Sequence, residues 1–256
     1  LVVSLAGVAF VAVQVLSVLT SLEIDWRNPI EEVLALARAL SFDLDGLRLA
    51  CAISASPQML LGFRFIVAIG CAPVVFLALW LKRRRMPELE LRVEFTNAMG
   101  MVVSTLFITV VLACTSPLMC YQHPEGSGSS VRSTPSVLCW EGDEHLSLVV
   151  QSVVYLCAIP LPFFAATVLT TLRLPRWTAS NTPGSLRRLK ESRFLFVRFA
   201  PERYYYGIIF QARSLLLCLV PIVFTSLALQ VLSLGILMLT FGVVQQQLNP
   251  WRKRFV

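Results

Sequence analysis

The sequence predicts an all-α fold, a polytopic transmembrane helical bundle of about six spans with the N- and C-termini in the cytoplasm. Three observations support this prediction. Of the 256 residues, 56% are hydrophobic and 14% are charged, whereas a soluble domain carries roughly 25% charged residues. Six apolar stretches approach the roughly 20 residues that a crossing helix needs. The segments between them alternate between basic and acidic. We therefore treat residues 1–256 as one transmembrane domain.

The six predicted spans are, in chain order, residues 1–22, 58–81, 97–119, 146–172, 206–225 and 226–248. Four of them contain no charged residue, while Arg64 interrupts the second and Arg213 the fifth. The last two spans are separated only by a tight turn near Thr225 and Ser226. A signal peptide is the alternative for the first span, but the stretch lacks a basic start and a clear cleavage site. Because the chain begins with Leu1, we expect a further N-terminal part.

The charges of the connecting segments predict the orientation. Sixteen of the 22 lysines and arginines lie between spans two and three, between spans four and five, or after span six. Ten of the 15 carboxylates lie in the other two connections. The positive-inside rule then places the basic connections in the cytoplasm. The predicted connections are residues 82–96 and 173–205 on the inner side and residues 23–57 and 120–145 on the outer side. Topology explains the basic charge, so we expect no nucleic-acid binding.

Two cysteines frame the second outer connection. Cys120 and Cys139 lie on the side of the membrane where disulfides persist, and a bridge between them would stabilise the fold by about 3 kcal/mol. The alternative is a zinc site, with the ligands Cys120, His123, Cys139 and His145. An oxidising compartment argues against free thiolates, so we predict the disulfide and no metal or other cofactor. The partner of Cys51, on the same side, is left open.

The first outer connection is predicted to contain a short helix. Asn28 is a typical N-cap residue, Pro29 would stand at the first helical position and Glu31 at the third. Apolar residues then recur at helical spacing up to Leu40. We expect a helix over residues 28–40 that lies on the membrane surface or packs within a larger outer domain.

A basic segment on the inner side is predicted to contact anionic lipid. A turn at 182–184 precedes a stretch in which basic residues alternate with leucines and phenylalanines. Such a segment suits the headgroup layer and attracts anionic lipids, although a plain topology signal would look the same. The candidate lipid-contact residues are Arg187, Arg188, Lys190, Arg193, Arg198 and Arg203.

The predicted spans offer few groups for chemistry. Arg64 and Arg213 are their ionisable residues, and no carboxylate lies deep in a span. Serine, threonine and glutamine side chains within the spans suit either a polar path or bonds between helices. The sequence contains no Gly-rich phosphate loop, HExxH or GxSxG motif. We therefore expect no catalytic activity.

Several short motifs resemble the membrane region of large protist surface proteins of the dinoflagellate type. These motifs are Phe42-Asp43-Leu44-Asp45, the stretch Cys120-Tyr121-x-His123-Pro124-x-Gly126 with its closing Val137-Leu138-Cys139, residues 203–217 and Asn249-Pro250-Trp251-Arg252. In that family a cysteine-rich, ephrin-receptor-like or EGF-like ectodomain precedes a polytopic helical region. A looser similarity links the chain to transient-receptor-potential-like membrane proteins. The resemblance implies a cell-surface protein with a missing ectodomain and carries over no catalytic residue.

The function that these observations favour is a non-enzymatic, multi-pass integral membrane protein, a receptor-like or channel-like module of the plasma membrane. Its expected partners are the bilayer, anionic lipids of the inner leaflet and the missing N-terminal ectodomain. The alternative is a solute or ion transporter whose path runs through the helix bundle. A polar cavity at mid-membrane would favour transport, and a sealed bundle would favour the receptor-like role.

Overall fold

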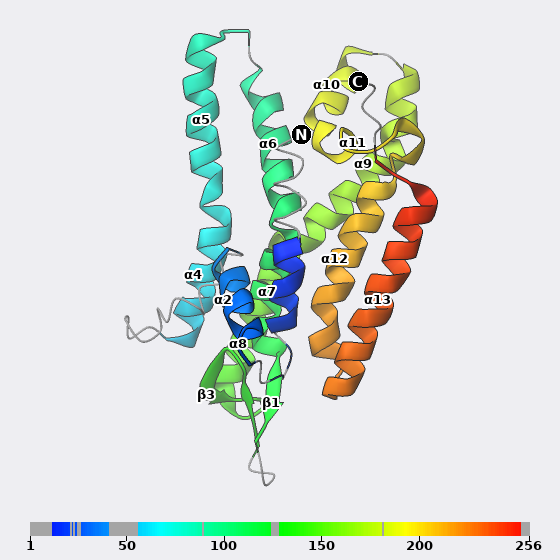
Figure 1. Ribbon diagram of the computed structural model, residues 1–256. Coiled ribbons are helices and arrows are strands. Elements are labelled where there is room, and N and C mark those ends of the chain that lie inside the picture. The colour runs from blue at the N-terminus through cyan, green and yellow to red at the C-terminus, as the bar shows by residue number, and fades with distance from the viewer. Residues whose placement is uncertain are drawn as a thin grey trace.

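The computed structural model describes residues 12–20, 22, 24, 27–40, 56–88, 90–123, 128–180 and 182–251. This part of the chain is mostly helical, as predicted, and a small β-sheet stands at one end of the helices (Figure 1). The helices of the bundle are α4 (Pro57–Ile69), α5 (Cys71–Arg85), α6 (Leu91–Thr105), α7 (Phe107–Thr115), α8 (Gly142–Ala158), α9 (Pro160–Ser180), α12 (Tyr206–Val223) and α13 (Leu227–Leu248). The other helices are α2 (Ile30–Leu40), η2 (Ser116–Leu118), α10 (Pro183–Glu191), α11 (Arg193–Phe196) and η4 (Pro201–Arg203). The strands are β1 (Cys120–Gln122), β2 (Ser129–Val131) and β3 (Thr134–Leu138).

Three helical stretches of the described part are long and apolar enough to cross a membrane: Gly142–Ser180, Tyr206–Val223 and Leu227–Leu248. The bent pair Leu91–Thr105 and Phe107–Leu118 makes a fourth if it is counted as one span. These residues therefore support three to four of the six predicted spans. The first predicted span lies mostly outside the described residues. The second is divided at Gly70 into helices of 13 and 15 residues, each shorter than a crossing needs.

The last two spans agree with the prediction to within two residues. Val223 ends α12 and Leu227 begins α13, so a turn of three residues joins them. At the open end of this hairpin, the Tyr206 hydroxyl donates to Gln245 Oε1 over 3.4 Å. Long apolar runs separated by a short turn leave two antiparallel neighbours as the natural arrangement.

The third predicted span is bent by 59° where Leu106 separates α6 from α7. Leu106 has φ −87° and ψ 7°, outside the α region. The hydroxyl of Thr105, directly before the break, donates to the Met101 carbonyl over 2.7 Å. Such back-bonding competes with the helical hydrogen bond at that carbonyl and often bends a helix. Residue 106 is neither proline nor glycine, so the bend could not be predicted from residue type.

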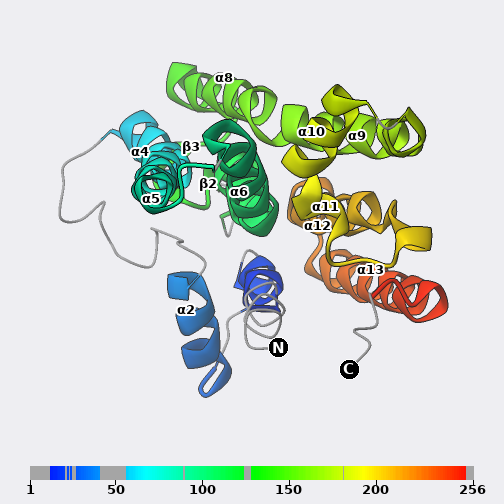
Figure 2. The same ribbon diagram turned by 90° about the horizontal axis from the view of Figure 1, so that it is seen from above.

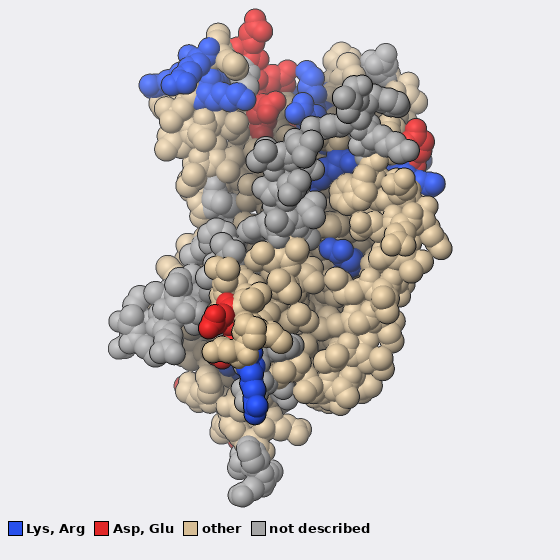
Figure 3. Space-filling model, in the orientation of Figure 1, with Lys and Arg blue, Asp and Glu red and all other residues tan. Residues whose placement is uncertain are grey.

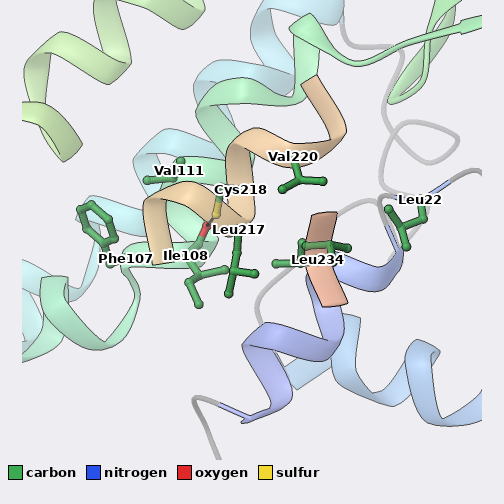
Figure 4. Packing of buried hydrophobic residues seen from close by; sticks show 9 residues of the cluster. Leu22, Phe107, Ile108, Val111, Leu217, Cys218, Val220 and Leu234 are labelled. Atoms are coloured by element: carbon green, nitrogen blue, oxygen red, sulfur yellow. Dashed lines mark hydrogen bonds between the residues drawn. The ribbon is translucent and has the colours of Figure 1, made fainter. Parts of the chain in front are cut away.

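The largest apolar cluster joins α7, α12 and α13 to the helical residues 12–20 (Figure 4). Val111 is 0% exposed and Leu217 is 1% exposed. The Cys218 thiol lies 3.7 Å from the Ile108 carbonyl, which places α12 directly against α7. Because lipid tails are as apolar as leucine, close packing of this kind, rather than exclusion from water, stabilises contacts between membrane helices.

A three-stranded antiparallel sheet occupies the predicted outer connection 120–145, where the all-α prediction had no strand. Its strand order is β1-β2-β3, and Cys120 pairs with Val131. Val131 and Val137 turn toward the helices and pack with Leu61 of α4 and Leu148 of α8. The sheet therefore covers the ends of α4 and α8, and we call it the lid.

The helix predicted over residues 28–40 is present as α2, which begins at Ile30, two residues after the expected N-cap, and ends at Leu40. α2 lies beside residues 12–20 in both views (Figures 1 and 2). Ser17 Oγ donates to the Ala37 carbonyl over 3.3 Å, and Leu34 and Ala37 are each 3% exposed. Ile30, Val33 and Leu36 remain exposed, which fits both predicted settings of this helix, a membrane surface and a larger outer domain.

An arginine of the lid holds the end of the first helical segment. Arg132 lies in the turn between β2 and β3, and its backbone N–H donates to the Met119 carbonyl over 2.9 Å. Its guanidinium donates to the carbonyls of Thr20 and Leu22. Helix C-terminal carbonyls carry partial negative charge and favour a cation there. Arg132 therefore connects the lid to residues 12–20.

The two connections that were predicted to lie on the inner side are mostly helical, which the sequence did not predict. Of the connection 82–96, residues 86–90 lie between helices, because α5 continues to Arg85 and α6 begins at Leu91. In the connection 173–205, α9 continues to Ser180 and α10 and α11 follow. The predicted turn at 182–184 is the start of α10, with Thr182 as its N-cap.

Candidate functional site

A groove of about 800 Å³ opens where the ends of α5, α6 and α10 meet. Its lining residues are Arg83, Pro87, Glu88, Glu90, Leu91, Arg92, Pro183, Leu186, Arg187 and Lys190. Four of them are cations and two are carboxylates. We call this feature the basic groove. Charged side chains gather at this end of the molecule, while the middle of the visible face is mostly uncharged (Figure 3).

The end of α5 supplies Arg83 in a run of four basic residues, Lys82 to Arg85. Cations suit this position because the last carbonyls of a helix carry partial negative charge. Neighbouring arginines of the run have different surroundings. Arg84 lies over the Trp80 ring, with Cζ 3.9 Å from the ring centroid, whereas Arg83 lines the groove.

α10 supplies the opposite wall. The Thr182 hydroxyl accepts the Ser185 N–H over 3.4 Å, and Pro183 fills the first helical position, a favourable start for a helix. Arg187 lines the groove and pairs with Glu191 over 3.3 Å, and Lys190 stands one turn further along. Arg188 turns away from them and lies 5.6 Å from the centroid of the Trp177 ring.

α6 forms the floor between these walls and is held firmly against α11. The Phe194 N–H donates to Asn97 Oδ1 over 2.8 Å. Gly100 lies so close to the Phe194 ring that a Cβ at this position would overlap it. That ring also stacks on Phe163 of α9, with centroids 6.2 Å apart. The floor is therefore fixed by packing, while the charged walls extend beyond it.

The electrostatics of the groove favour an anionic group. Among the described residues that line it, only Arg187 has an ion pair closer than 4 Å, and its partner Glu191 lies outside the lining. Guanidinium groups match the geometry of phosphate oxygens and bind them through paired hydrogen bonds. Leu91, Leu186 and the two prolines add apolar surface. Cations around an apolar floor suit a phosphorylated headgroup with the start of its lipid tail.

The six predicted lipid-contact residues do not form one site. Arg187 and Lys190 line the groove, and Arg188 lies on Trp177. Arg193 and Arg198 are exposed elsewhere on the surface, and Arg203 donates to the Tyr205 hydroxyl over 3.1 Å. Arg83 and Arg92, which line the groove, were not among the predicted site residues. The predicted topology had placed both arginines on the same side of the membrane as Arg187, and this was the feature of the sequence from which a shared site could have been predicted.

Cys120 and Cys139 form the expected disulfide, with the Cα atoms 6.3 Å apart. His145 lies beside the bridge, 1% exposed. His123 is apart from it, since its Nε2 bonds to Ser130 Oγ over 2.7 Å. The structure thus brings together three of the four proposed zinc ligands and uses two of them in the covalent bridge.

Polar side chains within the spans mostly bond to their own helix. The hydroxyls of Thr105, Thr167 and Thr171 each donate to the carbonyl four residues earlier. A bond between helices joins Gln14 to Thr109 over 3.0 Å. Gln211 of α12 differs, because it is 2% exposed and neither amide atom has a partner among the described residues.

Of the two cations predicted within spans, Arg64 and Arg213, the structure describes the side chain of one. Arg213 lies on α12 with Cζ 4.8 Å from the centroid of the Phe210 ring. The side chain of Arg64 lies outside the described residues. Neither residue lines the basic groove.

Comparison with known proteins gives no relative: no family model matches the chain, and neither does any curated protein or solved structure.

Proposed function

We propose that this chain is a non-enzymatic, multi-pass membrane module, receptor-like or channel-like, whose inner end binds anionic lipid headgroups. The observation that carries the proposal is the basic groove. Residues about 100 positions apart in the sequence, Arg83 and Arg92 on one side and Arg187 and Lys190 on the other, surround one hollow. A topology signal alone needs basic residues near the membrane but does not need them around a cavity.

We infer six crossings, with both termini and the basic groove in the cytoplasm and the lid outside, in the plasma membrane. Residues 1–22 and the consecutive helices α4 and α5 would add two crossings to the four candidates. The basic groove and the lid lie at opposite ends of the bundle (Figure 1), which supports this orientation. An ectodomain of the kind found in the protist surface proteins would then need a further crossing ahead of residue 1.

Lipid retention tests the role of the groove. The purified chain, in a neutral detergent, is mixed with short-chain phosphatidylinositol bisphosphate, phosphatidylserine or phosphatidylcholine, and bound lipids are measured by native mass spectrometry. We expect the bisphosphate to bind best and phosphatidylcholine not to bind. The Arg83→Gln/Arg187→Gln variant should bind the bisphosphate about tenfold or more weakly, because each basic residue near an anionic surface contributes about 1 kcal/mol.

The matched control is Arg84→Gln/Arg188→Gln, which removes the same charge from the same two helices. These two arginines lie on tryptophan rings, so affinity should fall less than threefold. Equal losses in both variants would show that net charge, and not the groove, attracts the lipid.

Labelling from outside should reach Ser129→Cys of the lid and miss Arg187→Cys; the reverse pattern would overturn the orientation.

Gln211 favours solute transport as a second candidate function. A buried amide without partners costs about 1–3 kcal/mol, and it lies on α12, which packs against the bent span at α7. Broken helices and unpaired polar groups within the membrane are typical of transporter binding sites. Uptake of labelled solutes into proteoliposomes would be lost in Gln211→Leu if the path exists, and no uptake by the unaltered chain would exclude this function.

A further inference from the structure

Three aromatic rings connect α6 to α7 beside the bend at Leu106, and we call them the aromatic row. The Phe194 ring of α11 lies against Gly100 of α6, where a Cβ would overlap it. The same ring stacks on Phe163 of α9, with centroids 6.2 Å apart and planes 23° apart. Phe163 in turn contacts the ring of Phe107, the first residue of α7, with centroids 6.2 Å apart. The row therefore joins the two halves of the bent span by a route other than the backbone.

The far end of the row is anchored in the apolar core. Phe107 is 2% exposed and belongs to the cluster that packs α7 against α12 (Figure 4). Aromatic pairs at these separations attract each other in addition to burying apolar surface, and close-packed side chains transmit a displacement to their neighbours. A shift of the Phe194 ring would therefore reach α7.

The near end of the row is attached to a wall of the basic groove. Phe194 follows Lys190, a lining residue, by four positions, and only Ser192 separates α10 from α11. The Ser192 N–H donates to the Arg188 carbonyl over 3.0 Å, and its carbonyl accepts the Leu195 N–H over 3.0 Å. Because Ser192 is bonded to both helices, a displacement of α10 would displace Phe194 as well.

An anion in the groove would act on this wall. α6 lies between α5 on one side and α10 and α11 on the other (Figure 2). In the empty groove, Arg83 of α5 and the cations of α10 repel one another across the floor. A phosphorylated group between them replaces this repulsion by attraction to both walls. Binding should therefore draw α10 toward α5.

We propose that a phosphorylated headgroup in the basic groove controls the bend between α6 and α7 through the aromatic row. This inference rests on the proposed function, since it requires an anion in the groove. The bound headgroup moves α10, α10 moves Phe194 across Gly100, and Phe163 passes the displacement to Phe107. Since binding and bending are linked, the bend changes the affinity for the headgroup by the same factor as the headgroup changes the bend. The lipid is then a regulator of the shape of the span.

Hydrogen exchange of the full chain in neutral detergent tests this coupling, with short-chain phosphatidylinositol bisphosphate as the probe and phosphatidylcholine as the control lipid. Residues 105–110 begin about 20 Å along α6 from Arg92, beyond direct contact with a headgroup. The bisphosphate should change their amide exchange rates at least threefold, and phosphatidylcholine should not. If native mass spectrometry detects bound bisphosphate while these rates stay constant, the coupling is overturned and the proposed function stands. If the bisphosphate does not bind, both fail.

Two variants of α9 test the route. Phe163→Leu should still bind the bisphosphate, with affinity reduced at most about threefold, but should lose the response of residues 105–110. Phe164→Leu is the matched control, because Phe164 packs on the same apolar cluster and has no ring contact with Phe194 or Phe107 in the described part of the chain. Equal loss of the response in both variants would show that α9 was loosened in general and would contradict the role of the aromatic row.

A third variant tests the row without lipid. Gly100→Ala places a methyl group in the position of the Phe194 ring, so the ring must move. Exchange of residues 105–110 should then differ at least threefold from that of the unaltered chain in the same detergent. An unchanged rate would show that the position of Phe194 does not influence the bend, and the coupling would be overturned.

Discussion

The two ends of the molecule are built in opposite ways. The lid is short in sequence and closed, with a disulfide, a buried histidine bonded at both nitrogens and Arg132 on the carbonyls of the first helical segment. The basic groove is assembled from distant segments and is open, with four cations around a hollow and one ion pair, Arg187–Glu191, at its edge.

This difference assigns stabilisation of the fold to the lid and recognition of a ligand to the groove. At the lid, polar and sulfur groups bond to one another within the chain, so they add to stability and offer little to a ligand while the bridge is closed. At the groove, unpaired cations repel one another and reduce stability, but they remain free to bind an anion. Changes at the lid should therefore act on stability, and changes at the groove should act on binding.

The largest effect is expected from removing the bridge. Cys120→Ser/Cys139→Ser reopens a loop whose ends are 19 residues apart, which should lower the stability of the lid by about 3 kcal/mol. Hydrogen exchange of the amides in β1, β2 and β3 should accelerate about a hundredfold. Exchange in α10 should stay unchanged. If α10 loses protection to the same degree, the two ends are not independent and the comparison fails.

An intermediate loss of stability should distinguish the two histidines beside the sheet, His145 in α8 and His123 directly after β1. His145→Asn leaves the Trp140 N–H and the Pro117 carbonyl without their buried partner, which should cost about 2 kcal/mol. His123→Asn is the control, since it is less buried and loses one bond, to Ser130; we expect less than about 1 kcal/mol. Thermal unfolding of both variants in one detergent measures the difference. Equal losses would mean that burial of His145 does not matter to the lid.

The smallest effect is expected at the groove, and it is a gain in lipid affinity rather than a loss of stability. Glu191→Gln removes the partner of Arg187 and should strengthen binding of phosphatidylinositol bisphosphate about two- to threefold, since an exposed pair of this spacing is weak. The unfolding temperature should hardly change. Glu202→Gln, on η4 and outside the groove lining, is the control. Weaker binding in Glu191→Gln would show that the ion pair holds Arg187 in its binding position.

Apolar length and cysteine position were sufficient to predict much of the molecule. The α12–α13 hairpin, the helix near residues 28–40 and the pairing of Cys120 with Cys139 are all present. Each depends on a local signal: a long apolar run, a favourable helix start, or two cysteines in one predicted outer connection.

The features that were missed depend on contacts between distant residues. Strands of three to five residues, rich in serine, are too short to show a period of two. The bend at Leu106 follows from a hydroxyl bond and packing, without proline or glycine. The groove forms because α6 holds α10 and α5 at a fixed separation. The contact of Gly100 with the Phe194 ring, which fixes α6 against α11, joins residues far apart in the sequence and is present only in the folded chain.

The hydrogen bonds of Arg132 have a mechanical consequence. Because one guanidinium binds the carbonyls of Thr20 and Leu22 from the turn of the sheet, a displacement of the sheet would pull on the end of the first helical segment. Force applied to the sheet would therefore pass through Arg132 to residues 12–20, as well as through the packing of the sheet on α4 and α8.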